Sequence, residues 1–233
     1  MTWGRALRNQ HITIAIDGPS GAGKSSLARA AAERFGLMYV DTGAIYRTVG
    51  LAVKRAGLGF GDAEGVKALL PELDIRLTYD SAGAQRMLLF GEDISAEIRL
   101  PEISIYAADV SAMPDVRAFL LETQREFARE NSVIMDGRDI GTVVLPDAGL
   151  KIFLTASAED RAARRFEELR RLGLDAQYDE VLRDIRYRDA YDTRRAAAPL
   201  RAAEDAVILD TTGNTAEQSR ALIFQIIAER FGL

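Results

Sequence analysis

The sequence Ile12-Thr-Ile-Ala-Ile-Asp-Gly-Pro-Ser-Gly-Ala-Gly-Lys-Ser25 decides the fold of this chain. Its isoleucines, Ile12, Ile14 and Ile16, alternate with smaller residues in a β-branched run, which predicts a short buried strand. The stretch 18–25 has the spacing Gly, four residues, Gly-Lys-Ser, and apolar residues at helical spacing follow it. Strand, glycine-rich turn and helix in this order are the context of a phosphate-binding loop.

This loop predicts a site for nucleotide phosphates. Its glycines allow a tight turn whose N–H groups, together with the helix N-terminus, point at phosphate oxygens. We expect Lys24 to reach the β- and γ-phosphates from the edge of a solvated nest, and Ser25 to bind Mg²⁺ through its hydroxyl. The residues expected to bind ATP here are Gly18, Pro19, Ser20, Gly21, Ala22, Gly23, Lys24, Ser25 and Ser26.

The composition is that of a soluble globular protein: 233 residues, 48% hydrophobic and 28% charged. One domain with mobile subdomains is the first expectation, and two small domains are the alternative. The absence of cysteine excludes thiolate chemistry, and the single histidine, His11, disfavours a histidine metal cluster or a Ser-His triad. A net charge of −5 argues against general nucleic-acid binding. No apolar run is long enough to span a membrane or to serve as a signal peptide, so we expect a cytoplasmic protein.

The remaining pattern alternates short apolar runs with helical periodicity, which predicts an α/β fold with a mainly parallel sheet. Further strands are expected at 37–40, 133–135, 151–154 and 207–210, and helices at 44–55, 62–70, 101–111, 115–130, 159–172 and from a capping box at Thr215 to about 230. Two runs at 74–79 and 85–90 interrupt the alternation and predict an antiparallel hairpin. Residues 173–199 are polar and arginine-rich, with few large apolar side chains.

Charged residues follow two of the predicted strands, in Asp41-Thr-Gly-Ala-Ile-Tyr-Arg47 and in Asp136-Gly-Arg-Asp139. In an open parallel sheet, ligands bind outside the carboxyl ends of the strands. Asp136 is suited to hold Mg²⁺ through water, and Arg138 is suited to bridge phosphates with its planar fork. Thr42 could face an acceptor, as could Arg47, although a solvated helix position would explain Arg47 equally well.

Arginines in the last third of the chain form a further candidate group. Arg161 and Arg165 lie one helical turn apart, and the segment Arg188-Asp-Ala-Tyr-Asp-Thr-Arg-Arg195 lies in the polar stretch. Phosphoryl transfer spreads negative charge over the transferred oxygens, and preorganised arginines stabilise it. These side chains could therefore close over the phosphates, although a solvated charged loop is the simpler alternative.

Taken in order, the motifs make the chain resemble the bacterial cytidylate kinase family over nearly its whole length. They are the phosphate loop, Asp41–Arg47, Gly91-Glu-Asp-Ile-Ser95, Asp136-Gly-Arg-Asp-Ile-Gly-Thr-Val-Val144 and the run that ends in Ala198-Pro-Leu200. The resemblance implies the nucleoside monophosphate kinase fold of P-loop proteins, with a parallel five-stranded core sheet and helices on both faces. It implies one domain over 1–233, with a small inserted acceptor-binding subdomain at about 60–100 and an arginine-rich lid at about 173–199.

The resemblance also implies transfer of the ATP γ-phosphoryl group to CMP or dCMP, with Mg²⁺ as cofactor, by a monomer without nucleic-acid or membrane partners. It implies that Lys24, Arg138, Arg188 and Arg195 are catalytic, that Ser25 and Asp136 hold the metal, and that Arg161 and Arg165 contact ATP. Around the acceptor it places Thr42, Arg47, Arg117, Arg138, Asp139, Arg188, Asp192 and Arg195. Ala108 stands where relatives usually carry a serine near the base, and Ser104 or Ser111 would have to compensate.

Two other functions stay open. The first is a kinase for UMP or a small alcohol. An alcohol acceptor needs an acid that takes the proton of its hydroxyl group. Asp41 could serve, but it has no second acid beside it. A nucleotide sensor without turnover is the other, but a sensor needs no such density of arginine near the transferred group.

Overall fold

The computed structural model describes residues 11–81, 83–171 and 173–233. The chain forms two compact units. The core unit contains residues up to Tyr39 and from Ala128 onward, and the second unit runs from Val40 to Phe127. Among the helices formed by the described residues, none combines the length and the apolar character that a membrane crossing requires.

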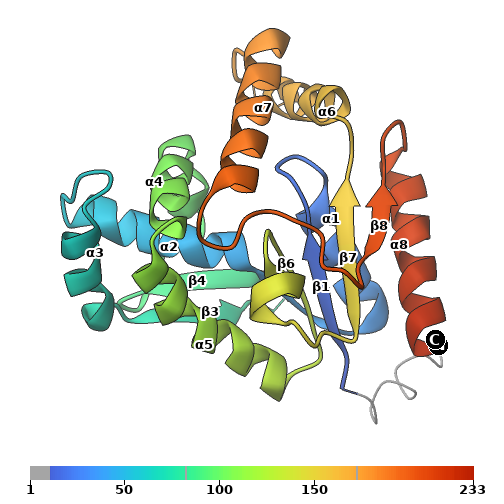
Figure 1. The fold of residues 1–233 in the computed structure, drawn as a ribbon, viewed down its shortest axis with the longest axis horizontal. Coiled ribbons are helices and arrows are strands. Elements are labelled where there is room, and N and C mark those ends of the chain that lie inside the picture. The colour runs from blue at the N-terminus through green and yellow to red at the C-terminus, as the bar shows by residue number, and fades with distance from the viewer. Residues whose placement is uncertain (1–10, 82, 172) are drawn as a thin grey trace. The chain divides into compact units, whose positions relative to one another are not determined.

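The core unit is built on a parallel sheet of five strands in the order β2-β6-β1-β7-β8 (Figure 1). The strands are β1 (Thr13–Asp17), β2 (Met38–Asp41), β6 (Val133–Gly137), β7 (Leu150–Thr155) and β8 (Val207–Asp210). β1 is the central strand, with Ile14 opposite Ile134 on one side and opposite Leu150 on the other. Strands of such a sheet are covered on both faces, and Ile14, Ala15 and Ile16 are accordingly all buried. The predicted parallel α/β sheet is confirmed.

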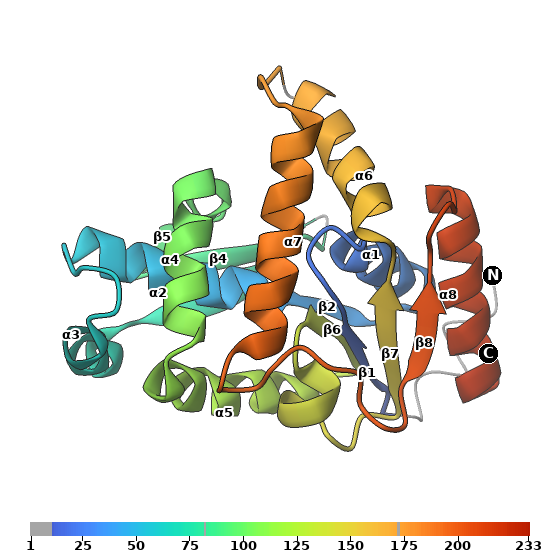
Figure 2. The ribbon, with the colours of Figure 1, turned by 45° about the horizontal axis from the view of Figure 1, so that its top comes forward.

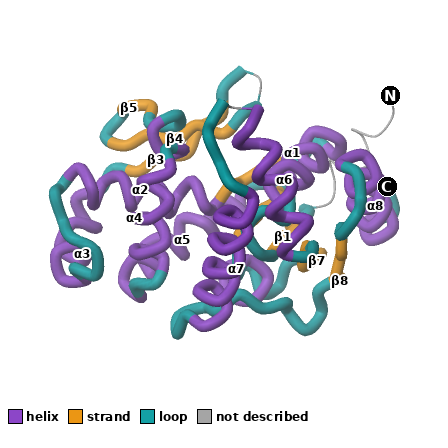
Figure 3. Tube along the Cα trace, turned by 90° about the horizontal axis from the view of Figure 1, so that it is seen from above, coloured by secondary structure: helices purple, strands orange, loops and turns teal. Residues whose placement is uncertain are grey.

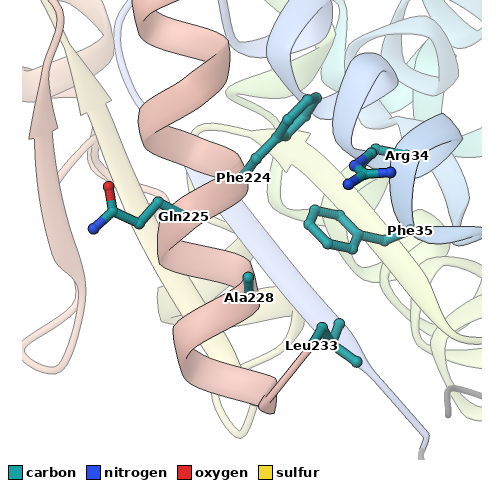
Figure 4. Close-up of a pocket in the computed structure, with 6 residues that line it drawn as sticks. All are labelled: Arg34, Phe35, Phe224, Gln225, Ala228 and Leu233. Carbon is teal, nitrogen blue, oxygen red and sulfur yellow. The ribbon is translucent and has the colours of Figure 1, made fainter. Parts of the chain in front are cut away.

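Two helices of the core unit complete its hydrophobic core. α1 (Lys24–Phe35) contributes Leu27, Ala28 and Phe35, and α8 (Ala216–Phe231) contributes Ile223 and Ile227. The capping box predicted at the start of α8 is present. A hollow of about 230 Å³ lies between the two helices (Figure 4), and no predicted site residue lines it. Its lining residues are Arg34, Phe35, Phe224, Gln225, Ala228 and Leu233.

The arginine-rich part of the core unit is a pair of helices, α6 (Ala158–Arg171) and α7 (Tyr178–Arg194), which pack side by side (Figure 2). Ala162, Val181 and Ile185 are buried between them. The helix predicted at 159–172 is confirmed as α6, although its predicted last residue lies outside the described residues. Most of the polar stretch 173–199 is the helix α7, which the sequence did not predict because only a few of its residues are apolar.

The second unit holds a small antiparallel sheet, β3 (Ile75–Tyr79), β4 (Gln85–Leu89) and β5 (Glu92–Asp93), whose strands lie together in Figure 3. The predicted hairpin is confirmed, with Leu77 opposite Met87. The two-residue strand β5 was not predicted. The helical segments of this unit are α2 (Thr42–Arg55), α3 (Ala63–Leu69), η3 (Leu70–Glu72), η4 (Glu97–Arg99), α4 (Pro101–Ser111) and α5 (Pro114–Glu130), which runs on into the core unit.

Two features of α2 depend on single residues. The helix begins at Thr42 rather than at the predicted Ala44, because the Asp41 side chain accepts a hydrogen bond from the Ala44 N–H and caps it. At Gly50, α2 packs closely on α4: a Cβ there would lie 2.8 Å from the backbone nitrogen of Ala107. The glycine inside this helix is therefore explained by the close approach of α4.

Candidate active site

The phosphate loop is residues Gly18–Gly23, between the end of β1 and the start of α1. Gly18 has a φ of 153°, and a Cβ there would lie 1.9 Å from the carbonyl oxygen of Leu154 in β7. Only glycine allows the chain to leave β1 so close to the neighbouring strand. The predicted order of strand, glycine-rich turn and helix is confirmed, and α1 directs its N-terminus at the loop.

Lys24 is the first residue of α1, and its ammonium group donates to the carbonyl oxygen of Pro19 at 2.8 Å. The residue is only 6% exposed, so the expectation that it lies at a solvated edge is wrong. Burial, with the nearby Arg138 guanidinium second, lowers the pKa of Lys24 to about 7. Burial thus destabilises the charged form of Lys24, and an anion bound in the loop would stabilise it.

Ser25 and Asp136 meet beside the loop. The Ser25 hydroxyl donates to Asp136 Oδ2 at 2.8 Å, and the Tyr39 hydroxyl donates to Asp136 Oδ1 at 2.9 Å. A hydroxyl and a carboxylate are the oxygen ligands that Mg²⁺ takes, and Mg²⁺ in such sites keeps several waters and binds substrate phosphates. The described residues contain no cluster of three or more acidic, histidine or cysteine side chains that could hold a metal alone. The donor set fits the predicted ion.

Arg138 and Asp139 follow β6, and both contact the end of α7 or the residue after it. Arg138 Nε donates to Asp192 Oδ2 at 2.7 Å, and Arg195 Nη2 lies 3.6 Å from Asp139 Oδ1. Asp139 and Arg195 are both nearly inaccessible to solvent, and Arg195 Nε also donates to the carbonyl of Ala198. The structure therefore brings four of the predicted acceptor residues together in the core unit.

The two arginines expected to contact ATP differ in their surroundings. Arg161 is 4% exposed; its guanidinium donates to the carbonyls of Ala156 and Ser20, and to both carboxylate oxygens of Asp189 on α7 at 3.0 and 2.6 Å. Arg165 is exposed and pairs with Glu168, one turn along α6. The guanidinium of Arg161 thus ties the phosphate loop to α7, and ATP could reach it only by displacing protein acceptors.

Arg188 lies apart from these pairs. It is exposed on α7, and within the described chain its side chain forms no ion pair or hydrogen bond. An exposed arginine on the helix that also carries Asp192 is available to an incoming anion. Its predicted role therefore stays a prediction that depends on the bound state.

The second unit holds the other predicted acceptor residues. Arg47 Nη2 and Arg99 Nη2 lie 3.1 and 2.9 Å from Asp41 Oδ2. Burial alone would raise the pKa of Asp41, but the two guanidinium groups outweigh it and the pKa is lowered. Arg117 donates to the carbonyl of Ser111 at 3.2 Å, and its guanidinium lies over the ring of Tyr46. Thr42 is buried at the start of α2.

The position that departs from the family pattern, Ala108, is exposed on α4. The hydroxyl of Ser111 donates to the carbonyl of Ala108 at 2.9 Å. Whether Ser104 or Ser111 replaces the missing serine stays a prediction.

Among the contacts that the sequence analysis did not foresee, Tyr39 contacts Asp136, Arg99 contacts Asp41 and Asp189 contacts Arg161. The sequence could have indicated Asp189 as a site residue, since it lies next to Arg188 in the quoted segment. No local sequence pattern could have indicated Tyr39 or Arg99, because their partners lie far away along the chain.

Comparison with known proteins shows the family to which the chain is similar. The family model described as Cytidylate kinase matches residues 14–229. A cytidylate kinase of Caldicellulosiruptor saccharolyticus is 46% identical over 95% of this chain and 97% of its own length. One of Carboxydothermus hydrogenoformans is 47% identical over 94% and 98%. A solved structure of an uncharacterized protein from Eubacterium ventriosum has a TM-score of 0.50, is 15% identical and covers 93% of this chain and 98% of that one, a likeness that shows the fold alone.

Proposed function

Because the chain belongs to the cytidylate kinase family, we propose that it transfers the γ-phosphoryl group of ATP to the phosphate of CMP or dCMP, giving ADP and CDP or dCDP. The observation that carries the proposal is the junction of β1, α1 and β6. There the phosphate loop, the buried Lys24 and the Ser25–Asp136 pair lie together at the carboxyl ends of the strands.

On the donor side, the loop N–H groups bind the phosphates of ATP. Lys24 exchanges the Pro19 carbonyl for phosphate oxygens, which restores its full charge. Ser25 and Asp136 hold Mg²⁺ in the complex. When bound, the ion supplies positive charge that neutralises the β- and γ-phosphate oxygens.

On the acceptor side, Arg138, Arg188 and Arg195 bind the phosphate, and Asp139 and Asp192 bind the base or sugar. Support comes from the two pairs that these residues now form with each other, Arg138–Asp192 and Arg195–Asp139. In each pair the arginine is proposed to bind the acceptor phosphate and the aspartate is proposed to bind the base or sugar. One bound nucleotide could therefore give both members of a pair a new partner. From the second unit we add Thr42, Arg47 and Arg117.

The reaction needs no general base, because the attacking oxygen belongs to a phosphate that is already anionic near neutral pH. Catalysis then consists of alignment, neutralisation of charge and exclusion of water. Arginine is suited to this work because its fork binds two phosphate oxygens and does not lose its proton. We propose that the segment 173–199 acts as the lid that excludes water.

An acceptor screen tests the proposal. The purified protein is incubated with ATP and Mg²⁺ and with CMP, dCMP, UMP or a small alcohol, and the products are separated by ion-exchange chromatography. We expect CDP and dCDP. Phosphorylation of UMP or the alcohol alone would favour the alternative kinase, and ATP binding without any product would favour the sensor. A cytoplasmic location and a monomeric state stay predictions.

A further inference from the structure

Asp17 is a buried carboxylate for which the phosphate-binding site gives no role. It is the last residue of β1, immediately before Gly18, and it is 4% exposed. In the part of the chain that the structure describes, no salt bridge joins it to a cation, although the charge of Lys24 is near enough to lower its pKa. Burial raises its pKa to about 6. Burying a carboxylate costs free energy unless hydrogen bonds replace its hydration, so its hydrogen-bond partners have to be identified.

Both carboxylate oxygens of Asp17 bind the backbone of the segment that follows β6. Oδ1 accepts from the N–H of Ile140 and Oδ2 accepts from the N–H of Gly141, each at 2.7 Å. These two amides begin a turn of π-helix at Ile140–Val144. They are 123 and 124 residues away from Asp17 in the sequence, so the contact joins two distant segments.

The segment held by Asp17 carries two of the proposed acceptor residues. Gly137 lies opposite Asp17 in the pairing of β1 with β6, and Arg138 and Asp139 come between this pair and the two bound amides. Arg138 and Asp139 are therefore fixed to the phosphate-loop strand on both sides, by strand pairing before them and by the Asp17 carboxylate after them.

The side-chain contacts of this segment cannot provide the same anchor. Arg138 and Asp139 contact Asp192 and Arg195, which the proposed function assigns to the acceptor. Those contacts must change when the acceptor binds. The two hydrogen bonds to Asp17 join its carboxylate to the backbone amides of Ile140 and Gly141 and use no proposed acceptor side chain, so the acceptor does not have to displace them.

We infer that Asp17 is a positioning residue for acceptor recognition, which holds Arg138 and Asp139 at a fixed place relative to the phosphate loop. The inference rests on the proposed function. It predicts that a change at Asp17 affects the acceptor much more than ATP, although Asp17 is the direct neighbour of the loop that binds ATP.

The test is Asp17→Asn, which keeps the shape of the side chain. An asparagine has one acceptor oxygen and one NH₂ group, so one of the two buried N–H groups loses its acceptor and faces a donor. Such a loss typically changes an equilibrium by about 5- to 150-fold. We expect a fall of this size in kcat/KM for CMP, a lower preference for CMP over UMP, and a dissociation constant for a non-hydrolysable ATP analogue that stays within about twofold.

The control separates positioning from general loss of stability. Ile14 lies on the same strand and is fully buried, and its partners in the sheet are Ile134 and Leu150 rather than residues of the segment 138–141. Ile14→Val or Ile14→Ala, whichever matches the lowered melting temperature of Asp17→Asn, should leave the ratio of CMP to UMP turnover unchanged. Combining Asp17→Asn with Arg138→Ala should cost less than the sum of the two effects, because both act on one contact.

A second variant covers the case in which Asp17→Asn does not fold. A Cβ at Gly141 would lie 3.2 Å from Cγ and Cδ of Lys151 and 3.3 Å from Asp17 Oδ2, so Gly141→Ala displaces the lysine stem and the carboxylate slightly and keeps both charges. It should lower kcat/KM for CMP and the preference for CMP over UMP, as Asp17→Asn does, but by a smaller factor. The inference would be overturned if the Asp17 and Gly141 variants had acceptor kinetics no worse than those of the Ile14 control. It would also be overturned if their affinity for the ATP analogue fell as much as their kcat/KM for CMP. In both cases CMP kinase activity of the wild type would still uphold the proposed function. A wild type that binds the ATP analogue and neither binds nor phosphorylates CMP would overturn both.

Discussion

Binding of ATP should be accompanied by uptake of a proton at Lys24. Lys24 is buried, its ammonium group donates to the Pro19 carbonyl, and burial lowers its pKa to about 7. A triphosphate in the loop places negative charge beside the ammonium group and favours its charged form. The bound state therefore holds a proton that part of the free protein lacks.

The size of the effect follows from the pKa. With a pKa of about 7, Lys24 is charged in roughly half of the free molecules at pH 7 and in roughly a tenth at pH 8. If the bound form is fully charged, binding takes up about half a proton at pH 7 and about 0.9 at pH 8. Affinity for ATP should accordingly fall as the pH rises above 7, by up to about tenfold per pH unit.

Isothermal titration calorimetry measures the uptake directly. ATP is titrated into the protein at pH 8, where its phosphates are fully ionised, in several buffers with different enthalpies of ionisation. The slope of the observed enthalpy against the ionisation enthalpy gives the number of protons. Lys24→Met is the control, since it keeps most of the length of the side chain and cannot titrate. A wild-type slope of zero, or the same slope in Lys24→Met, would refute the reasoning.

Three further predictions concern the charged residues of the core unit. Asp189→Asn removes the charge that Arg161 pairs with, so the free energy of unfolding should fall by about 1.5–3 kcal/mol; chemical denaturation checks this, and an unchanged value would mean that the pair is worth nothing. Arg188→Gln should keep the melting temperature, because Arg188 is exposed, and lower kcat by about 10²–10³ in steady-state kinetics; an unchanged kcat would remove it from the site. Asp192→Ala should change the ratio of CMP to UMP turnover, whereas Arg138→Ala should depress both alike, and the reverse pattern would contradict the assigned roles.

The sequence predicts those parts of the fold that local patterns determine. The apolar run before Gly18, the glycine spacing and the capping box at Thr215 each lie within a few residues of the structure they specify. The hairpin at 75–89 is equally local, since its two strands are nearly adjacent in the chain. Predicted boundaries fail where a side chain extends an element, as Asp41 does for α2.

The pairing of site residues is not predictable in this way, because it depends on segments far apart in the sequence. Arg161 was expected to contact ATP, yet its guanidinium binds Ser20 and Asp189, which lie 141 and 28 residues away. Lys24 was expected at a solvated edge, and only the packing around the loop shows that it is buried. The contact of Asp17 with the segment after β6 likewise has no local signal.

The most direct test of phosphoryl transfer between nucleotides follows the γ-phosphate itself. ATP labelled with ³²P at the γ-position is mixed with CMP and an excess of the protein, and the reaction is stopped within a single turnover. We predict that the label appears in the β-phosphate of CDP, and that little appears as inorganic phosphate because water is excluded. Label released as inorganic phosphate, with CMP unchanged, would contradict the account.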